Sequence, residues 1–405
     1  YHVQTYGPHF DYYEFGDAFR ADLFDPGEWA ALFRDAGAKY VVITSKHHDG
    51  YCLWPSEAAN DRGFPWNSMN TGPQRDLLGE LTPAVQAAGL KMGFYYSLYE
   101  WFHPWWQNDK ERFVAEHFHP QFKDLVERYR PDIVWGDGEW ELEAEKWRTP
   151  ELMAWLFNES SVKDNVVIND RWGKNTRGRH GGYYTTEYEA GEVDYDRPWE
   201  ECRGMGFSFG YNRAEGAAVY NDARNLVLML VDVVSKGGNL LLDIGPDGRG
   251  QIPPIMQDRL LRMGRWLNTY GEAIYGTRAW ERPVQWSAGE RDYEAFFKEQ
   301  RYLSGEYILR QTVNPPEGYA AKQVFFTRKG DDLYAILPQW PGGALRLRDL
   351  PAARRPTGIT LLGANRKLAG RRQGKDLLID LPAYDPSWFT EEEAYAYVIK
   401  LSDLL

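Results

Sequence analysis

Cysteine is scarce in this chain of 405 residues, which contains only Cys52 and Cys202. Two cysteines allow at most one disulfide bond, and they cannot form a metal site by themselves. A fold that depends on several disulfide bonds, or on a metal site made of cysteines alone, is therefore excluded. We expect both side chains to be free thiols near the functional site.

Long hydrophobic runs are also missing. The longest one, Leu226 to Val231, is far shorter than the roughly 20 residues that a membrane-spanning helix needs, so no membrane segment and no membrane partner is predicted. The sequence begins at Tyr1 without a charged and then apolar leader. It is thus expected to be either a processed chain or a fragment. The compartment stays open between an extracytoplasmic one (secreted, periplasmic or lysosomal) and the bacterial cytoplasm.

The chain lacks an excess of basic residues. Its 47 Lys and Arg stand against 59 Asp and Glu, which gives a net charge of −12. A nucleic-acid binder needs a basic surface that displaces the counterions of the phosphates. We therefore expect no nucleic-acid partner and no anionic polymer as substrate.

Aromatic residues, in contrast, are abundant: 17 Trp, 26 Tyr and 19 Phe make up 15% of the chain. Aromatic rings with a polar edge suit sugars, which offer C–H faces for stacking and hydroxyl groups for hydrogen bonds. Packing in the core accounts for more than half of these rings. The length suits two domains, or one large barrel with an appendage.

Helical and strand patterns alternate through the first two thirds of the sequence. Asp25 is placed to cap a helix with Pro26 at its first position, and the β-branched run at 39–45 follows. The same pairing predicts further helices at about 78–88, 110–129, 150–157 and 219–235, and strands at 91–97, 132–135, 164–170 and 239–245. Polar and aromatic residues follow most of these strands. This alternation is typical of a (β/α) barrel, whose chemistry lies at the carboxyl ends of its strands.

From about residue 278 the pattern changes. Short alternating runs are separated by Gly, Pro and Asp turns, which predicts an antiparallel β-sandwich. We expect a catalytic (β/α) barrel at 1–277 and a β-sandwich domain without catalytic residues at 278–405.

The stretch PDIVWGDGEW, residues 131–140, has the strongest site-like pattern. A short buried strand ends in Asp137, which lies between two glycines and two tryptophans. Asp-Gly is also a common turn dipeptide, so a simple turn is the alternative for this stretch alone.

Many segments together resemble glycoside hydrolase family 29, the retaining α-L-fucosidases. They occur in the family's order over about residues 35–280: KHHDGYCLWPS, RDLLGEL, GFYYSLYEWFHP, WGDGEWE, NDRWG, GGYY, SFGYNR, VDVVSKGGNLLLDIGP and GEAIYG. The resemblance implies an exo-acting hydrolase that removes terminal α-L-fucosyl residues by double displacement. Its partner would be a fucosylated oligosaccharide or glycoconjugate, no metal or other cofactor is implied, and the oligomeric state is left open.

The resemblance also assigns roles. Asp137 matches the nucleophile and Glu187 the acid/base, with Glu200 and Glu139 as alternatives for the second role. A structural salt bridge or helix cap is the other interpretation of these glutamates. Substrate-binding positions are matched by six residues: His47, His48, Tyr95, Trp135, Arg171 and Phe209, the last as a platform for the fucose methyl group.

One part of the family pattern has no counterpart. The family has a first strand with a further histidine, and a later Glu-Trp pair, ahead of the matched region, and this sequence shows neither before that region. The expected fold is therefore an α/β protein, a (β/α)8-like TIM barrel with its first strand missing, followed by an antiparallel β-sandwich. An incomplete pocket would lack polar contacts, which puts turnover in question.

Two other functions are considered. The first is a metal-dependent hydrolase with His47, His48, Asp137 and Asp170 as ligands. Adjacent histidines on a strand are expected to point to opposite faces, which disfavours it. The second is a carbohydrate-binding protein that has lost turnover.

Overall fold

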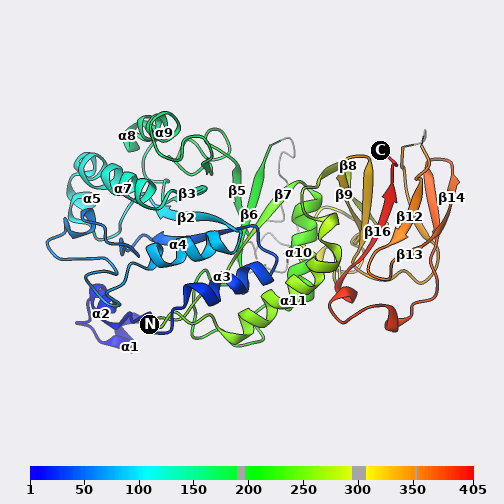
Figure 1. Cartoon of the computed structure of the whole chain (residues 1–405), viewed down its shortest axis with the longest axis horizontal. Coiled ribbons are helices and arrows are strands. Elements are labelled where there is room, and N and C mark those ends of the chain that lie inside the picture. The colour runs from blue at the N-terminus through cyan, green and yellow to red at the C-terminus, as the bar shows by residue number, and fades with distance from the viewer. Residues whose placement is uncertain (189–196, 294–306, 352–353) are drawn as a thin grey trace. The chain divides into compact units, whose positions relative to one another are not determined.

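The computed structural model describes residues 1–188, 197–293, 307–351 and 354–405 (Figure 1). It divides into two compact units, and each is considered by itself. The first comprises residues 1–34, 38–185 and 246–253, and the second residues 35–37, 186–245 and 254–405. In the described part of the chain, no helix is both long enough and apolar enough to cross a membrane.

A parallel sheet forms the centre of the first unit. Its strands are β1 (Tyr40–Lys46), β2 (Lys91–Ser97), β3 (Ile133–Asp137) and β4 (Val167–Ile168), hydrogen-bonded in that order. Each lies within two or three residues of its predicted range, except that β4 is much shorter than the predicted strand at 164–170. The parallel arrangement brings the carboxyl ends of the strands to one edge, as a (β/α) fold requires.

Helices connect these strands and pack their apolar sides into one core. The helix α7, for example, buries Phe122, Leu125 and Val126, which recur at helical spacing. The helical segments are α1 (His2–Tyr6), η1 (Tyr12–Glu14), α2 (Phe15–Ala18), α3 (Pro26–Asp35), η2 (Ala58–Asn60), α4 (Leu77–Ala87), α5 (Pro104–Asn108), α6 (Lys110–Arg112), the π-helix η3 (Phe113–Phe118), α7 (His119–Tyr129), α8 (Ala144–Trp147) and α9 (Thr149–Asn158). The predicted helices at 78–88, 110–129 and 150–157 are therefore present, the second with a π-helical segment within it.

Strand β1 contains an irregularity near its end. Thr44 pairs with Tyr95 and Lys46 pairs with Tyr96, so Ser45 is an extra residue in β1. Such a β-bulge re-aims the side chains that follow it. The strand then ends at Lys46, immediately before His47 and His48.

The second unit contains the parallel strands β6 and β7 and the last two residues of β5, the third strand of the sheet β5-β6-β7. These strands are β5 (Tyr184–Glu187), β6 (Trp199–Gly204) and β7 (Gly238–Asp243). Two helices accompany them, α10 (Ala223–Ser235) and α11 (Pro254–Tyr270), followed by η4 (Gly271–Ala273). Helix α10 begins four residues later than predicted, because the Asp222 side chain accepts a hydrogen bond from the main-chain N–H of Asn225 and caps it there.

The rest of the second unit is antiparallel. A six-stranded sheet has the order β13-β12-β16-β10-β9-β8 and a three-stranded sheet the order β11-β15-β14. Leucine, isoleucine and aromatic side chains from both sheets form one core, as in a β-sandwich. The elements are β8 (Arg278–Trp286), α13 (Tyr307–Arg310), β9 (Lys322–Lys329), β10 (Asp332–Leu337), β11 (Leu345–Leu347), β12 (Gly358–Leu361), β13 (Arg366–Lys367), β14 (Ala369–Gln373), β15 (Asp376–Asp380), η5 (Pro386–Trp388), η6 (Glu393–Tyr395) and β16 (Tyr397–Ser402).

The sequence pattern changes where the antiparallel part begins, at β8. The limits 1–277 and 278–405 for two domains stay a prediction. Neither cysteine forms a disulfide bond in the described part of the chain, as predicted, and both side chains are buried.

Candidate active site

Asp137 is the last residue of β3, a strand whose residues are all buried. Gly138 follows with a φ of +76°, a left-handed conformation that favours glycine, and a Cβ there would lie 2.6 Å from the ring of Tyr99. The turn alternative and the site prediction are therefore compatible, since the chain turns immediately after Asp137. The Asp137 side chain keeps a small exposed part, 7% for the residue.

Each carboxylate oxygen of Asp137 accepts one hydrogen bond. The hydroxyl of Tyr95 donates to Oδ2 at 2.6 Å, and Nη1 of Arg171 donates to Oδ1 at 2.9 Å. Burial by itself would raise the pKa of Asp137, but the charge of Arg171 and these two hydrogen bonds lower it below its ordinary value. Asp137 is thus ionised at neutral pH, as a carboxylate nucleophile must be.

Arg171 is held in place by further contacts. Its Nε donates to Oγ1 of Thr185 at 2.8 Å, and the Thr185 hydroxyl donates to Oδ1 of Asp170, also at 2.8 Å. Its guanidinium lies over the ring of Trp135, 4.3 Å from the centroid. Three groups therefore orient the arginine that stabilises the charge of Asp137.

The hydrogen bonds around His48 assign its tautomer. Oγ of Ser97 donates to the carbonyl oxygen of Tyr99 at 2.7 Å, so Nδ1 of His48, 2.6 Å from the same Oγ, must be the donor between them. Nε2 of His48 then carries a lone pair and lies 3.7 Å from Oδ2 of Asp137. Burial, with the neighbouring His47 and Lys46, lowers the pKa of His48 to about 3. His48 is therefore a neutral acceptor beside the carboxylate, suited to a ligand hydroxyl.

His47 lies on the same side as His48. The two ring centroids are 4.0 Å apart, and His47 stacks on Tyr95 with an interplanar angle of 4°. The expectation that these histidines point to opposite faces is wrong, because β1 ends at Lys46 and the N–H of Gly50 closes a turn on the carbonyl of His47. The alternation of side chains holds only within a strand.

Aromatic rings surround the histidines. Trp135 stacks on Tyr95 at 5.6 Å between centroids, and the indoles of Trp101 and Trp140 lie 5.6 and 5.4 Å from His48. Trp101 and Trp140 are 38% and 46% exposed, so their rings are accessible to a ligand. Neither was predicted as a site residue, although both lie in the polar-aromatic segments after β2 and β3.

Glu187 and Phe209 belong to the second unit. Glu187 is the last residue of β5 and is partly buried, and Phe209 is 48% exposed with its ring 5.2 Å from that of Tyr188. The alternative Glu200 is buried in β6. The assignment of Glu187 and Phe209 to one site with Asp137 stays a prediction.

Glu139, the other alternative, has an unusual environment. It is 2% exposed, and its Oε2 has no hydrogen-bond partner among the described residues. Burial raises the pKa of Glu139 to about 7. The negative charge of Asp137 also raises this pKa, whereas the positive charges of Arg171 and Arg177 lower it. Glu139 therefore holds a proton in the range where Asp137 is already ionised.

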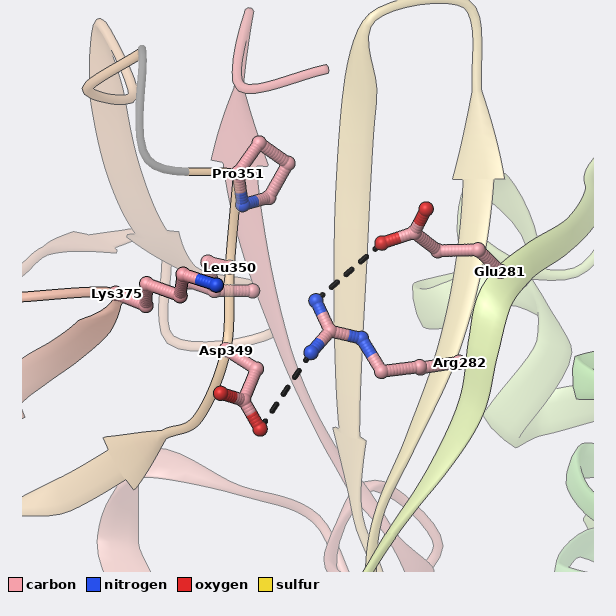
Figure 2. Close-up of a pocket in the computed structure, with 6 residues that line it drawn as sticks. All are labelled: Glu281, Arg282, Asp349, Leu350, Pro351 and Lys375. Atoms are coloured by element: carbon pink, nitrogen blue, oxygen red, sulfur yellow. Dashed lines mark hydrogen bonds and ion pairs between the residues drawn. The ribbon is translucent and has the colours of Figure 1, made fainter.

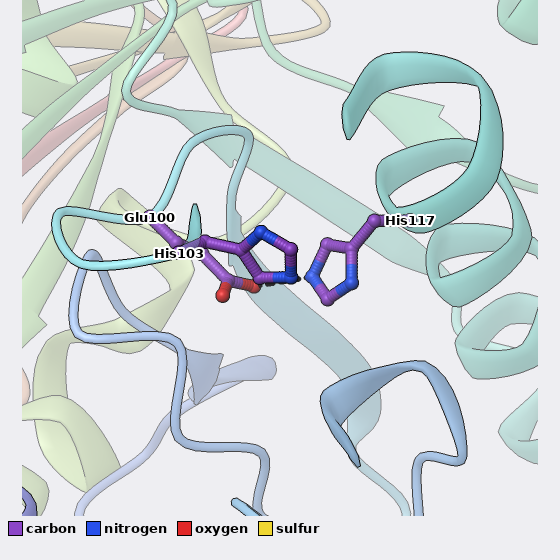
Figure 3. Close-up of side chains that lie close together, drawn as sticks. All are labelled: Glu100, His103 and His117. Carbon is purple, nitrogen blue, oxygen red and sulfur yellow. Dashed lines mark hydrogen bonds and ion pairs between the residues drawn. The ribbon is translucent and has the colours of Figure 1, made fainter. Parts of the chain in front are cut away.

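A second buried carboxylate, Glu100, follows β2. Its Oε1 accepts from Nζ of Lys46 at 2.8 Å and from Nε2 of His117 at 2.7 Å, while Arg62 donates to Oε2. Figure 3 shows the rings of His103 and His117 next to each other beside this carboxylate. The main-chain N–H of the next residue, Trp101, donates to the carbonyl of His48 at 2.7 Å, which ties this cluster to the histidine turn.

Glu100, His103 and His117 form the one group of His, Cys, Asp and Glu in the described ranges whose atoms are close enough to share a metal ion. Their environment does not fit one, because two basic side chains already contact Glu100 and Nε2 of His117 serves as a donor to it. The ligand set of the alternative metal hydrolase does not assemble: Asp170 accepts from Thr185 and from the N–H of Gly178.

Comparison with known proteins identifies the family to which the chain belongs. A sequence model of the family "Alpha-L-fucosidase" matches residues 1–272, and one of the "Alpha-L-fucosidase C-terminal domain" matches residues 318–402. The chain is similar to the tissue α-L-fucosidase of Homo sapiens, with 40% identity over 98% of this chain and 79% of that protein. It is 44% identical to the α-L-fucosidase of Dictyostelium discoideum, over the whole chain and 82% of that protein.

Solved structures agree. The crystal structure of Thermotoga maritima α-fucosidase superposes with a TM-score of 0.76 at 35% identity and covers 99% of this chain and 84% of its own. The same enzyme in complex with fucose gives a TM-score of 0.74 at 33% identity, again over 99% and 84%. The predicted fold class, a TIM-like (β/α) barrel followed by a β-sandwich, is confirmed, and this chain belongs to the α-L-fucosidase family of glycoside hydrolases.

Proposed function

We propose that the chain is an exo-acting α-L-fucosidase that removes terminal α-L-fucosyl residues with retention of configuration, and that Asp137 is its nucleophile. The observation that carries this assignment is the ionised Asp137 carboxylate, held by Tyr95 and Arg171 at a strand end next to the neutral His48. Its substrates are fucosylated oligosaccharides or glycoconjugates.

In the first step an Asp137 oxygen forms a bond to the anomeric carbon while the glycosidic C–O bond breaks. Glu187 gives its proton to the departing oxygen. The negative charge of Asp137 disappears in the ester, so Arg171 and Tyr95 stabilise the carboxylate before attack and again as it departs.

In the second step Glu187 takes a proton from water, and the water oxygen attacks the same carbon from the face that the leaving group vacated. The bond to Asp137 breaks and the free carboxylate is restored. Two inversions at one carbon give net retention.

Binding of the sugar uses acceptors and aromatic faces. Nε2 of His48 accepts a hydrogen bond from a sugar hydroxyl, and His47 contributes a second polar ring. Trp101 and Trp140 supply exposed faces for the C–H groups of the sugar. Phe209 is proposed as the platform for the fucose methyl group.

Nuclear magnetic resonance of the first-formed product tests the proposed mechanism. With an aryl α-L-fucoside as substrate, we expect α-L-fucose to appear before mutarotation produces the β anomer. Initial β-fucose would exclude double displacement at Asp137, and fucose binding without any product would favour a binding protein that has lost turnover.

A further inference from the structure

The charges of this acidic chain are strongly segregated. Residues 341–380 contain nine Lys or Arg and only three Asp or Glu, although the whole chain has a net charge of −12. This segment contains the three-stranded sheet β11-β15-β14 of the sandwich. The negative net charge therefore does not describe the surface of this sheet.

The register of the sheet sets which arginines face outward. Arg346 of β11 and Arg371 of β14 both pair with Leu378 of the central strand β15, so these three side chains share one face. The neighbouring residues Leu347 and Leu377 are buried in the sandwich core, which places that shared face outward. Since adjacent strands are about 4.8 Å apart, the two arginines start about 10 Å from each other.

Few carboxylates neutralise this face. Arg346 pairs with Asp376 at 2.6 Å and Arg371 with Asp380 at 3.1 Å. These are exposed pairs, which an anionic ligand can replace at small cost.

Other basic side chains near the sheet contact main-chain carbonyls instead. Arg348 donates to the carbonyl of Trp286, and Arg372 donates to that of Pro351 at 2.9 Å. A carbonyl orients a guanidinium and leaves its full charge in place. Burial lowers the pKa of Arg372, and the charge of Arg355 lowers it further. Lys375 and Arg355 are exposed, with no ion pair to a carboxylate in the described ranges.

The pocket next to this sheet differs from the sheet face because acidic side chains also line it. It measures about 630 Å³ and is lined by Glu281, Arg282, Asp349, Leu350, Pro351 and Lys375. Figure 2 shows Arg282 between its two carboxylate partners, Glu281 at 3.3 Å and Asp349 at 3.5 Å. These carboxylates would repel an anion, so the open sheet face is the better anion site.

We propose that the basic face, defined by Arg346, Arg348, Arg355, Arg371 and Lys375, binds sulfated glycan chains. Guanidinium groups form paired hydrogen bonds with the oxygens of an anionic ester, and cations spread over an extended sheet suit repeated charges on a polymer. The choice of a glycan rests on the proposed fucosidase function. Sulfated fucose-containing glycans would then be held at the sandwich while the barrel removes fucose.

Protection of sheet edges is the structural alternative, since β11 and β14 are both edge strands of their sheet. Charged edge residues prevent pairing with a second chain. Either sign of charge serves that purpose, however, and here the charged residues of both edge strands are arginines.

The experiment measures binding of the intact chain to immobilised dextran sulfate, with uncharged dextran as reference. We expect retention on the sulfated matrix alone, weakened by salt. The triple variant Arg355→Gln, Lys375→Gln, Arg371→Gln should bind about tenfold more weakly, because fewer counterions are displaced. A matched variant with three exposed arginines of the first unit changed, Arg112→Gln, Arg128→Gln, Arg148→Gln, should bind as the parent does.

Equal binding by both variants, or no retention of the parent chain, would overturn the proposal. DNA of the same charge should compete less well than the sulfated polymer. If it competes equally well, the face binds polyanions in general, and the proposal of a sulfated glycan is overturned. Hydrolysis of an aryl fucoside should be unchanged in the triple variant. If the parent binds dextran sulfate but hydrolyses no fucoside, the proposed function fails while the anion surface stands.

Discussion

Two buried carboxylates in the first unit lie at the ends of neighbouring strands, Asp137 as the last residue of β3 and Glu100 shortly after β2. They differ in how many groups contact them and in how much of each remains exposed. Asp137 accepts one hydrogen bond at each oxygen and remains 7% exposed. Glu100 is fully buried and is contacted by Lys46, Arg62 and His117. Burial opposes ionisation of both, and their basic neighbours lower both pKa values all the same.

The difference lies in what remains accessible. Glu100 is saturated by donors from three segments of the chain, so it can only hold those segments together. Asp137 has donors that orient it, a neutral acceptor beside it in His48, and an opening to solvent. A low carboxylate pKa alone therefore does not identify a nucleophile, and accessibility to a ligand separates the two residues.

Replacement of the accessible carboxylate should have the largest effect on activity. For Asp137→Ala we expect kcat on an aryl fucoside to fall at least about 1,000-fold, because the covalent route is lost. Azide should restore part of the rate and yield a β-fucosyl azide. Circular dichroism should show a folded variant. A rate near that of the parent protein would remove Asp137 from the mechanism.

Replacement of the enclosed carboxylate should act on stability instead. Glu100→Gln leaves Lys46 and Arg62 buried without their counter-charge, so we expect the free energy of unfolding to fall by about 3–5 kcal/mol. Urea denaturation measures this. The control is Glu116→Gln, whose exposed pair with Arg112 should contribute less than about 1 kcal/mol. Equal losses in the two variants would contradict the distinction between the sites.

Glu139 allows a third test, through pH. Its pKa is about 7 in the folded protein and 4.5 ordinarily, so folding favours its protonated form. The contribution of this pKa difference to the free energy of unfolding is fully present below pH 4.5. It is lost as the pH rises through 7, and the loss amounts to roughly 3 kcal/mol. Glu139→Gln should remove this part of the decrease in unfolding free energy between pH 5 and pH 8. An identical pH dependence in the variant would show that Glu139 does not titrate in this range.

The smallest expected effect concerns the tautomer of His48. Ser97→Ala removes the acceptor for Nδ1–H, so Nε2 is no longer fixed as the lone-pair side. We expect kcat/KM to fall about tenfold with little change in melting temperature. Ser97→Thr keeps the hydroxyl and should recover most of the activity. Loss of stability without loss of kcat/KM would make Ser97 purely structural.

Much of the first unit could be predicted from the sequence. Asp137 lies at the end of a buried β-branched run, and strand-end residues of parallel strands meet at one edge, so its proximity to Tyr95 and His48 follows from the pattern. The family resemblance supplied the roles. Ser97 and Thr185 were not predicted, because a single hydroxyl gives no pattern.

The Glu100 cluster was also not predicted. Its partners come from the end of β1, from the loop between η2 and α4 and from a π-helix, and no periodicity links them. The short strands β13 and β14 were missed too, since exposed basic residues there replace the usual alternation. The net charge of −12 is an average over the whole chain and does not show the basic residues of this sheet.

Because Ser45 is an extra residue in β1, the number of residues between Thr44 and His47 affects the position of the histidine turn. Without Ser45, Thr44 and Lys46 would pair with Tyr95 and Tyr96 in a regular ladder, and the direction that the bulge gives to the chain before the turn at His47 would be lost. We would then expect His48 to move away from Asp137. A variant of this enzyme can therefore change residue types in this segment more safely than it can change their number.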